Sequence, residues 1–492
     1  MQADWHCFRY PIRATLDCMN ASTPSAGLIS GSPGPLYQRL AEGLRGAVRR
    51  GEFGAGSRLP SERDLARSLG ISRTTVIGAY RLLREEGLLE SERGSGTRVV
   101  ASGRWIGPAV PAATMPSAKL TGEPAAGVVD LSGSVVVGPE AVPRPAADTT
   151  GLHELTAGFG YQPLGLPFLR ARIAARHTRL GLPTTADEVL VTNGAQQAIS
   201  LLFTLFGRNG GVIVTENPSY VGALDAAHAA GARLLALPTD AEGIKVRPLR
   251  ETLARHPVSL LYVMTTCQNP TGTVMSTQRR TEIARLAERA GVPVVDDTTL
   301  ADLVFEGRWH PLPTAATGIT VGSLSKLFWP GLRIGWLRAP GALMTRLARL
   351  KVVADLGSSD VGQQLASRLL PVSEDMATAR RGQLTARLDL MSELLRSRLP
   401  TWSWTRPSGG PFLWVRLPHG DGETFAQLAL GYGVQVLPGA RTSPDRGFAD
   451  HLRLSFVNEP ATLRIAVDRL GEAWAAYESG HGSGPRRSFT VA

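Results

Sequence analysis

Cysteine is scarce in this chain of 492 residues, which contains only Cys7, Cys18 and Cys267. Three widely spaced cysteines without neighbouring metal ligands argue against a disulfide framework and a zinc site, so we expect no bound metal and a reducing, cytoplasmic environment. Long apolar runs are also lacking. None reaches the roughly 18 residues that a membrane span needs, and the first thirty residues contain no continuous apolar stretch like that of a signal peptide. We expect a soluble protein without a membrane partner.

Lysine is the scarcest charged residue, and the chain has only Lys119, Lys245, Lys326 and Lys351. Arginine therefore supplies almost all of the formal net charge of +11. This charge permits a polyanionic partner such as nucleic acid but only weakly favours one. A lysine within a motif stands out against this background.

Composition divides the chain into folded and unfolded segments. Residues 1–33 mix Ser, Pro and Gly without periodicity and predict a disordered arm, whereas residues 102–126 are rich in Ala, Pro and Gly and predict a linker. The polar residues 479–492 predict a disordered tail. With 43% hydrophobic residues, the length suits two folded units, which we place at 34–101 and 127–478.

The first folded segment begins with apolar residues at every fourth position, Leu36, Leu40, Leu44 and Val48, which predict one buried helix face. Ser61 with Asp64 has the spacing of a capping box and predicts a second helix. A tight turn at 70–71 precedes a third helix that begins at residues 72–75. Two short helices joined by a glycine-containing turn are typical of a helix-turn-helix. The residues of the third helix expected to face inward are Val76, Tyr80 and Leu83.

Residues 88–91 and 97–100 flank a glycine-rich tip and predict a hairpin, the wing of an α+β winged helix-turn-helix. Polar side chains on the first turn of a recognition helix point at base edges. Arg73 is the best candidate for a bidentate contact to guanine, and Arg63 could reach a phosphate or a base edge. Solvated arginines on a small protein-interaction domain are the alternative. The candidate DNA-binding residues are Arg63, Ser72, Arg73, Thr74, Thr75, Gly94 and Gly96.

The whole stretch from Pro35 to Val100 resembles the GntR type of winged helix. The matching motifs, in order, are Pro35-Leu36-Tyr37, Leu59-Pro60-Ser61-Glu62-Arg63, Ser72-Arg73-Thr74-Thr75-Val76, Tyr80-Arg81-Leu82-Leu83 and Gly94-Ser95-Gly96-Thr97. The resemblance implies binding to double-stranded operator DNA.

The second folded segment alternates short β-rich runs with helical patterns. Uninterrupted apolar strands between helices predict an α/β fold with a parallel sheet covered on both faces. The runs that carry this prediction are 189–191, 212–214, 260–263, 292–295 and 319–321.

Several polar residues follow these strands. Lys326 comes just after 319–322, where a side chain projects from the end of a sheet into a crevice. A surface lysine is the alternative. Asp296 ends the strand 292–295 and is a candidate for the site. Asp297 is the alternative, because adjacent residues point in opposite directions and only one of the two can face the site. Asn269, in Asn-Pro-Thr-Gly, follows another strand, although such residues also make ordinary turns. The helix that begins at Gly194 can hold a phosphate at its N-terminus.

A lysine, an acid, a phosphate cradle and an arginine are what pyridoxal 5'-phosphate chemistry requires. In this order they resemble fold-type I aminotransferases over Val128 to Trp474. The resemblance implies an aldimine with Lys326, a pyridine-nitrogen bond to Asp296, a ring-oxygen bond from Asn269 and a ring contact from Tyr220. Arg453 would clamp an α-carboxylate. The implied phosphate ligands are Ala195, Gln196, Ser323, Ser325 and Arg333, with Tyr161 reaching the phosphate of the other subunit.

One position departs from the family. A tyrosine usually stands two or three residues after the aspartate, where this chain has Thr298 and Thr299. Threonine is shorter and does not stack on the ring.

The fusion of the two segments resembles the MocR-type regulators of bacteria. That family implies a multidomain, cytoplasmic, head-to-tail homodimer that binds pyridoxal phosphate, senses an amino acid or related amine, and repositions its DNA-binding domains. A catalytically active aminotransferase with an accessory N-terminal domain is the main alternative. A regulator of cofactor supply, which senses pyridoxal phosphate itself, is another.

Overall fold

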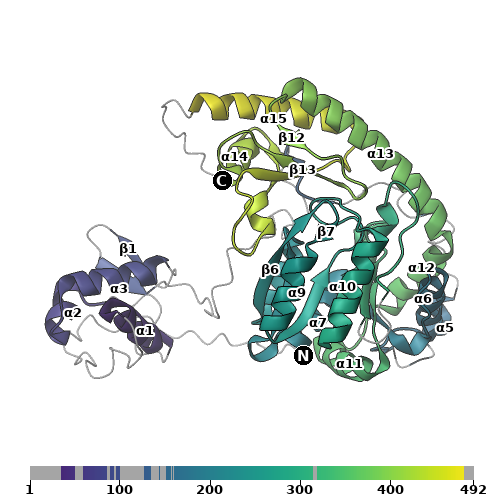
Figure 1. The fold of residues 1–492 in the computed structure, drawn as a ribbon, viewed down its shortest axis with the longest axis horizontal. Coiled ribbons are helices and arrows are strands. Elements are labelled where there is room, and N and C mark those ends of the chain that lie inside the picture. Colours follow the sequence, from purple (N-terminus) through teal and green to yellow (C-terminus); the bar gives the residue numbers. More distant parts are fainter. Residues whose placement is uncertain are drawn as a thin grey trace, which may run out of the picture. The chain divides into compact units, whose positions relative to one another are not determined.

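The computed structural model describes residues 35–49, 59–85, 89–92, 96–99, 127–134, 143, 151–156, 158, 160–313 and 318–480. The chain divides into two compact units, Met1–Ala109 and Val110–Ala492 (Figure 1). The predicted arm of 1–33 and the predicted linker of 102–126 lie outside the described residues. Of the predicted tail, residues 481–492 lie outside them, whereas 479 and 480 belong to the last helix.

The first unit contains the expected helix-turn-helix. Ser61 accepts a hydrogen bond from the backbone N–H of Asp64, and Gly70, at φ 65°, ends the second helix in the left-handed conformation. The core includes Leu40, Leu44 and the inward residues predicted for the third helix. The elements are α1 (Leu36–Arg49), α2 (Glu62–Leu69), α3 (Arg73–Glu85), and the antiparallel strands β1 (Leu89–Glu92) and β2 (Gly96–Val99).

An eight-stranded sheet forms the centre of the second unit, in the order β4-β11-β10-β9-β8-β5-β6-β7. The expected parallel arrangement is confirmed for six strands, but β11 and β7 are antiparallel to their neighbours. Their connections to the preceding strands are too short for the crossover that a parallel neighbour requires. The bounds are β4 (Val189–Thr192), β5 (Val212–Asn217), β6 (Arg233–Asp240), β7 (Gly243–Ile244), β8 (Val258–Val263), β9 (Val294–Asp297), β10 (Gly318–Ser323) and β11 (Gly335–Arg338).

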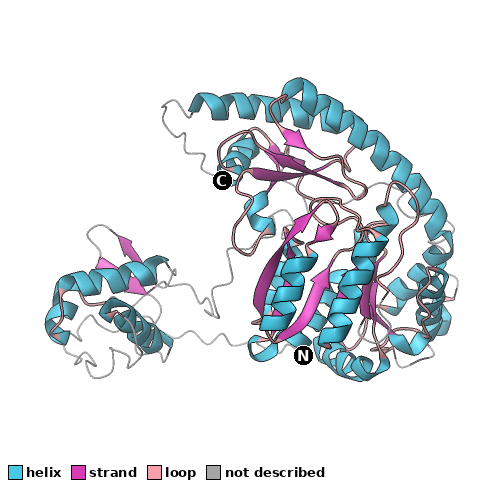
Figure 2. Ribbon diagram, in the orientation of Figure 1, coloured by secondary structure: helices cyan, strands magenta, loops and turns pink. Residues whose placement is uncertain are grey.

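Helices cover both faces of this sheet (Figures 1 and 2). On one face, α9 (Val246–Arg255) and α10 (Thr277–Ala290) pack over Val214, Leu261 and Val294. On the other, α7 (Gly194–Gly207) and α8 (Val221–Ala229) pack over alternate residues of the same strands. The remaining helices before the C-terminal part are α5 (Leu152–Leu155), α6 (Pro167–Arg179), α11 (Gly341–Asp355) and α12 (Asp360–Leu369).

A smaller C-terminal layer, which the alternating pattern did not separate from the rest, contains a four-stranded antiparallel sheet in the order β12-β13-β16-β15. The helices α13 (Ser373–Arg398) and α15 (Pro460–Gly480) run along its outside (Figure 1). Its other elements are β12 (Ser403–Trp404), β13 (Phe412–Arg416), α14 (Gly422–Gly431), β15 (Leu437–Pro438), β16 (His451–Ser455), and β14 (Val434–Gln435), which pairs with β3 (Val129–Asp130). Among the described residues, no helix is long and apolar enough to cross a membrane.

Candidate functional site

The carboxyl ends of the parallel strands meet at one edge of the central sheet, and the polar residues predicted from sequence gather there. Gly194 follows β4, Tyr220 follows β5, Asn269 follows β8 and Lys326 follows β10. In open α/β sheets this edge is where ligands bind. The fold therefore brings residues that are distant in sequence into one site.

Lys326 is partly buried at this edge, and its ammonium group donates hydrogen bonds to the hydroxyl and the carbonyl of Ser134. Ser134 comes from the segment after β3 and is 8% exposed. The surface-lysine alternative is therefore wrong. The lysine amine lies inside the site, close to a second polar side chain.

The start of α7 forms a cradle of backbone N–H groups. Arg333 donates from Nη2 to the carbonyl of Asn193 at 2.8 Å, so its guanidinium lies over the first turn. A Cβ added at Gly194 would lie 2.8 Å from this Nη2 atom, and one at Gly335 would lie 2.7 Å from the backbone nitrogen of Ala195. Glycine is favoured at Gly194 by its left-handed φ of 73° and required at Gly335 by the close backbone. An anion here would meet a helix N-terminus and a cation together.

Two serines after β10 contribute hydroxyls near this cradle. Ser323 is buried, and its hydroxyl accepts the backbone N–H of Ser325 at 3.1 Å. The hydroxyl of Ser325 is buried without any hydrogen-bond partner in the structure. A buried polar group without a partner is costly, so an unpaired hydroxyl here suits a ligand that binds it.

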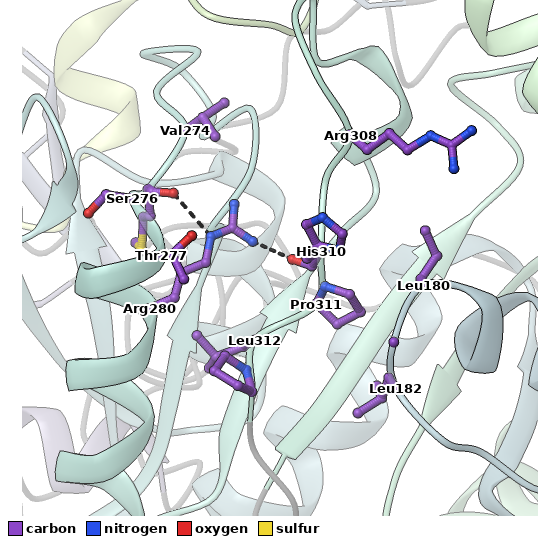
Figure 3. Close-up of a pocket in the computed structure, with 13 residues that line it drawn as sticks. Leu180, Leu182, Val274, Ser276, Thr277, Arg280, Arg308, His310, Pro311 and Leu312 are labelled. Atoms are coloured by element: carbon purple, nitrogen blue, oxygen red, sulfur yellow. Dashed lines mark hydrogen bonds between the residues drawn. The ribbon is translucent and has the colours of Figure 1, made fainter.

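Asp296 points away from this edge, toward the face covered by α10. Its carboxylate accepts hydrogen bonds from the backbone and the hydroxyl of Thr265 and from the backbone N–H of Leu312. Burial raises the pKa of Asp296, and the charge of Arg280 opposes this rise. Arg280, on α10, donates to the carbonyls of Met275 and His310 beside a cavity of about 470 Å³ (Figure 3). The carboxylate of Asp296 thus accepts its hydrogen bonds from other residues of the chain, away from the site.

Asp297 points to the opposite face, into the site. It accepts a hydrogen bond from the hydroxyl of Tyr262 at 2.6 Å and another from the backbone N–H of Thr299 at 3.0 Å. Burial raises the pKa of Asp297, while these bonds and the charge of Lys326 act in the other direction. The alternative aspartate, Asp297, is therefore the one whose charge lies close to the lysine.

Tyr220 begins α8 and donates its hydroxyl to the side-chain oxygen of Gln196 at 3.0 Å. Burial raises its pKa to about 12, and the nearby charge of Asp297 adds to the rise. The amide nitrogen of Gln196 is bonded to the carbonyl of Gly222. Because the side chain of Gln196 is hydrogen-bonded to Tyr220 and Gly222, only the backbone N–H of Gln196 remains for a phosphate.

Asn269 and Arg453 come together although they are far apart in sequence. Arg453 lies on β16 of the C-terminal sheet and donates from Nη1 to the side-chain oxygen of Asn269 at 2.8 Å, and from Nη2 to the carbonyl of Ser132. Its guanidinium carbon lies 4.0 Å from the ring centroid of Phe412, and its Nε is buried without a partner. Burial lowers the pKa of Arg453 to about 10. A buried cation with a free N–H group is suited to a carboxylate.

The two threonines that follow Asp297 have different surroundings. The hydroxyl of Thr298 donates to the carbonyl of Val321 on β10, which removes it from the site. The hydroxyl of Thr299 is buried without a partner, beside Asp297. Since Asp297 faces the site, the positions two and three residues after it, where a tyrosine is usual, are Thr299 and Leu300 rather than Thr298 and Thr299, and Leu300 is buried in the core.

Three polar groups of the site were missed from the sequence: Tyr262, Ser134 and Glu216. Tyr262 shares the face of Asp297 because it alternates with Leu261 along β8, a period-2 signal that was available. Glu216 is completely buried at the end of β5, and burial raises its pKa to about 8, so it carries a proton at neutral pH. Ser134 follows a two-residue strand, which has no usable periodicity.

The candidate DNA-binding residues of the first unit lie on α2 and on the start of α3. Ser72, Arg73 and Thr74 are exposed, as is Arg63, and Thr75 is half-buried. The Ser72 hydroxyl caps α3 by accepting the backbone N–H of Thr75. Gly96 begins β2, while Gly94 lies outside the described residues. The polar first turn is therefore presented to solvent as predicted.

Comparisons with known proteins agree with the expected families of both folded units. The bacterial regulatory protein family gntR matches residues 36–99, and the aminotransferase class I and II family matches residues 137–470. An uncharacterized HTH-type transcriptional regulator of Bacillus subtilis, YisV, is 33% identical, with 77% of this chain and 84% of the relative covered. The probable rhizopine catabolism regulatory protein MocR of Rhizobium meliloti is 28% identical over 90% of this chain and 95% of its own length.

The chain belongs to the MocR-type transcription regulators. Its second unit is also similar to LysN, an α-aminoadipate aminotransferase of Thermus thermophilus solved with N-(5'-phosphopyridoxyl)-L-leucine, with a TM-score of 0.65 and 29% identity over 72% of this chain and 94% of that one. The expected fold classes of both units are thus confirmed. Among the described residues of this MocR-type chain, no group of three or more His, Cys, Asp or Glu could hold a metal ion.

Proposed function

We propose that this chain binds DNA and responds to an amino acid or related amine through pyridoxal 5'-phosphate bound at the edge of the central sheet. The observation that carries the proposal is the meeting of Lys326, Asp297 and the start of α7 at one edge. A lysine amine, a buried carboxylate and a helix N-terminus are the three groups that the aldehyde, the pyridine nitrogen and the phosphate require.

The chain's own residues fit this cofactor. The unpartnered hydroxyl of Ser325 and the cradle at Gly194 are features that a phosphate would explain. When bound, the cofactor supplies an electron sink for bonds at an amine's α-carbon. Lys326 would hold its aldehyde, and Asp297, in place of Asp296, would keep its ring nitrogen protonated. Asn269 and Tyr220 would contact the ring, and the phosphate ligands would be Ala195, Gln196, Ser323, Ser325 and Arg333.

Arg453 is the proposed contact for the effector's carboxylate. Its unpartnered Nε lies in the same buried group as Asn269, so a carboxylate bound there would be close to the ring. This deduction makes an amino acid the favoured effector over an amine without a carboxylate. It also opposes the reading in which only cofactor supply is sensed, because that role needs no buried arginine.

We further propose a head-to-tail homodimer. Several apolar side chains of the second unit are exposed: Tyr161 at 68%, Trp329 at 46%, Val353 at 84%, Leu356 at 48% and Val361 at 58%. Contiguous exposed apolar surface marks interaction sites. Tyr161 would then reach the phosphate of the partner's site, which its exposure permits.

The test of the proposal is the absorbance of the purified protein after incubation with pyridoxal 5'-phosphate. We expect a visible band from the lysine-linked cofactor, and we expect Lys326→Ala to remove it without lowering the thermal unfolding temperature of the apo protein. Lys245→Ala is the matched control, since Lys245 lies before α9. A band that persists in Lys326→Ala would refute the cofactor assignment.

A second candidate is an active aminotransferase, which the likeness to LysN and the intact pair of Asn269 and Arg453 favour. The two functions differ in a direct measurement. Rapid conversion of an amino acid with a 2-oxo acid acceptor, together with no preference for any promoter segment, would support the enzyme. Promoter-specific binding without turnover would support the regulator.

A further inference from the structure

Lys351 is one of only four lysines in the chain, and its side chain is completely buried on α11. Its ammonium group donates to both carboxylate oxygens of Asp355, at 2.6 and 2.7 Å, and to the hydroxyl of Ser358 at 3.1 Å. All three N–H groups of the lysine are thereby bonded. The pair lies outside the set of groups that the proposed cofactor contacts, so its purpose needs a separate explanation.

Asp355 connects this pair to the start of α7. Its Oδ2 atom accepts hydrogen bonds from the side-chain nitrogens of Asn193 and Gln197, both at 2.6 Å. Asn193 is the residue before the helix, and its backbone N–H donates to the side chain of Gln197 at 2.8 Å. The first turn of α7 is therefore held by one carboxylate through Asn193 and Gln197.

The same turn carries the proposed phosphate cradle. Arg333 donates to the carbonyl of Asn193, whose side chain is bonded to Asp355. A shift of Asn193 would move both the backbone N–H groups of the helix start and the guanidinium above Gly194. The position of the cradle thus depends on Asp355.

Lys351 is fully buried, whereas the side chain of Asp355 remains 19% exposed. Such a pair is a poor device for stability alone, because the cost of removing the ammonium from water can exceed its attraction to the carboxylate. Burial lowers the pKa of Lys351, and the carboxylate of Asp355 opposes this. Burial alone would raise the pKa of Asp355, but the bonds from Lys351 and Gln197 outweigh it, and the pKa lies below its usual value. The bonds from the lysine to both carboxylate oxygens have the geometry of an ammonium–carboxylate pair, and fixing a geometry is the best-attested use of such pairs.

We propose that Asp355 and Lys351 are positioning residues that set the start of α7 for the phosphate group of pyridoxal 5'-phosphate. Asp355 orients Asn193 and Gln197, and Lys351 neutralises Asp355, so that a carboxylate can lie near the anion site without repelling the anion. This inference rests on the proposed cofactor.

The experiment compares two ligands that differ only in the phosphate, pyridoxal 5'-phosphate and pyridoxal. Dissociation constants are measured by absorbance titration for the full-length wild type, Asp355→Asn and Lys351→Met. We expect both variants to bind pyridoxal 5'-phosphate about tenfold more weakly, the scale of one charge-assisted hydrogen bond, and to bind pyridoxal as the wild type does. Asp355→Asn leaves the fully buried Lys351 without its counter-charge and can fail to fold, in which case Lys351→Met decides, because the Asp355 that it leaves is part-exposed and keeps the bonds from Asn193 and Gln197.

Glu188→Gln is the matched control, because Glu188 pairs with the buried Arg338 at the opposite end of β4 from α7. It should leave the ratio of the two dissociation constants unchanged. Equal weakening of both ligands in whichever of the two variants folds would show a general structural role and overturn the proposal, as would wild-type affinity for both ligands. If the wild type binds neither ligand through Lys326, the proposed function fails instead, and the two failures are distinguishable.

Discussion

At the scale of single residues, the phase of β9 decides which aspartate faces the site. Side chains of a strand alternate between faces. Val294 packs toward α10 and Val295 toward α7, so Asp296 and Asp297 follow in the same alternation. Asp296 then meets Thr265 and Leu312, while Asp297 meets Tyr262. One residue of difference separates an aspartate that stabilises a loop from one that can serve a cofactor.

This difference predicts opposite behaviour for two conservative substitutions. Asp297→Asn should weaken pyridoxal 5'-phosphate binding about tenfold and shift the visible band, because a neutral amide cannot hold a protonated ring nitrogen. Asp296→Asn should keep the band but lower the free energy of unfolding by about 1–3 kcal/mol, because one buried donor loses its acceptor. Absorbance titration and chemical unfolding measure the two effects. If Asp296→Asn alone loses the band, the assignment of the faces is wrong.

At the scale of elements, α3 combines a buried side with a polar first turn. Val76, Tyr80 and Leu83 are buried, and Tyr80 donates its hydroxyl to the carbonyl of Pro60, which ties α3 to the start of α2. The side chain of Arg73 remains 66% exposed, and its Nη2 atom lies 3.5 Å from Oε2 of Glu62. The helix is anchored by its apolar residues, and its first turn stays available for DNA.

Arg73→Ala should therefore weaken binding to a specific promoter segment by about 1–3 kcal/mol, a factor of about 5–150, and relax the base preference at one position. Arg67→Ala is the matched control, because Arg67 is equally exposed but pairs with Asp64 on α2. Its loss should change the affinity little and the base preference not at all. Binding measured at several salt concentrations separates the two effects. Equal losses in both variants would argue against base contact by Arg73.

At the scale of the whole molecule, regulation requires that ligand binding in the second unit changes DNA binding by the first. Such coupling is reciprocal: a ligand that changes DNA affinity by some factor has its own affinity changed by DNA by the same factor. The coupling depends on two arrangements of the chain that the ligand binds with different affinity. Binding of a ligand to one unit alone does not produce regulation.

We expect that one amino acid from a panel titrated by absorbance will change the promoter affinity about 5–150-fold, the usual range of such coupling. The same promoter fragment should then change that amino acid's dissociation constant by an equal factor. A scrambled fragment of equal length is the control for non-specific charge effects. If no member of the panel that binds alters DNA affinity, the second unit does not control the first through an amino acid.

The sequence by itself determined the helix-turn-helix, because its signals are local. The capping spacing of Ser61 and Asp64, the turn glycine and the four-residue apolar repeat each act within one or two helical turns. It also determined β4, β5, β8, β9 and β10 of the central sheet and the polar residues that follow them, but not β6, β7 or β11. The resemblance to fold-type I aminotransferases rests on the order of those residues, and it added the cofactor that they imply.

The tertiary structure alone decided which side chains meet. The choice of Asp297, the loss of Thr298 to β10 and the antiparallel strands β11 and β7 depend on strand phase and connection length, which composition does not reveal. The network of Asp355 joins residues 162 positions apart in sequence. Such contacts form only when the packed sheet and helices bring distant segments together. The physical reason for the division is therefore the range of the interactions: local interactions can be predicted from neighbouring residues in the sequence, and long-range interactions cannot.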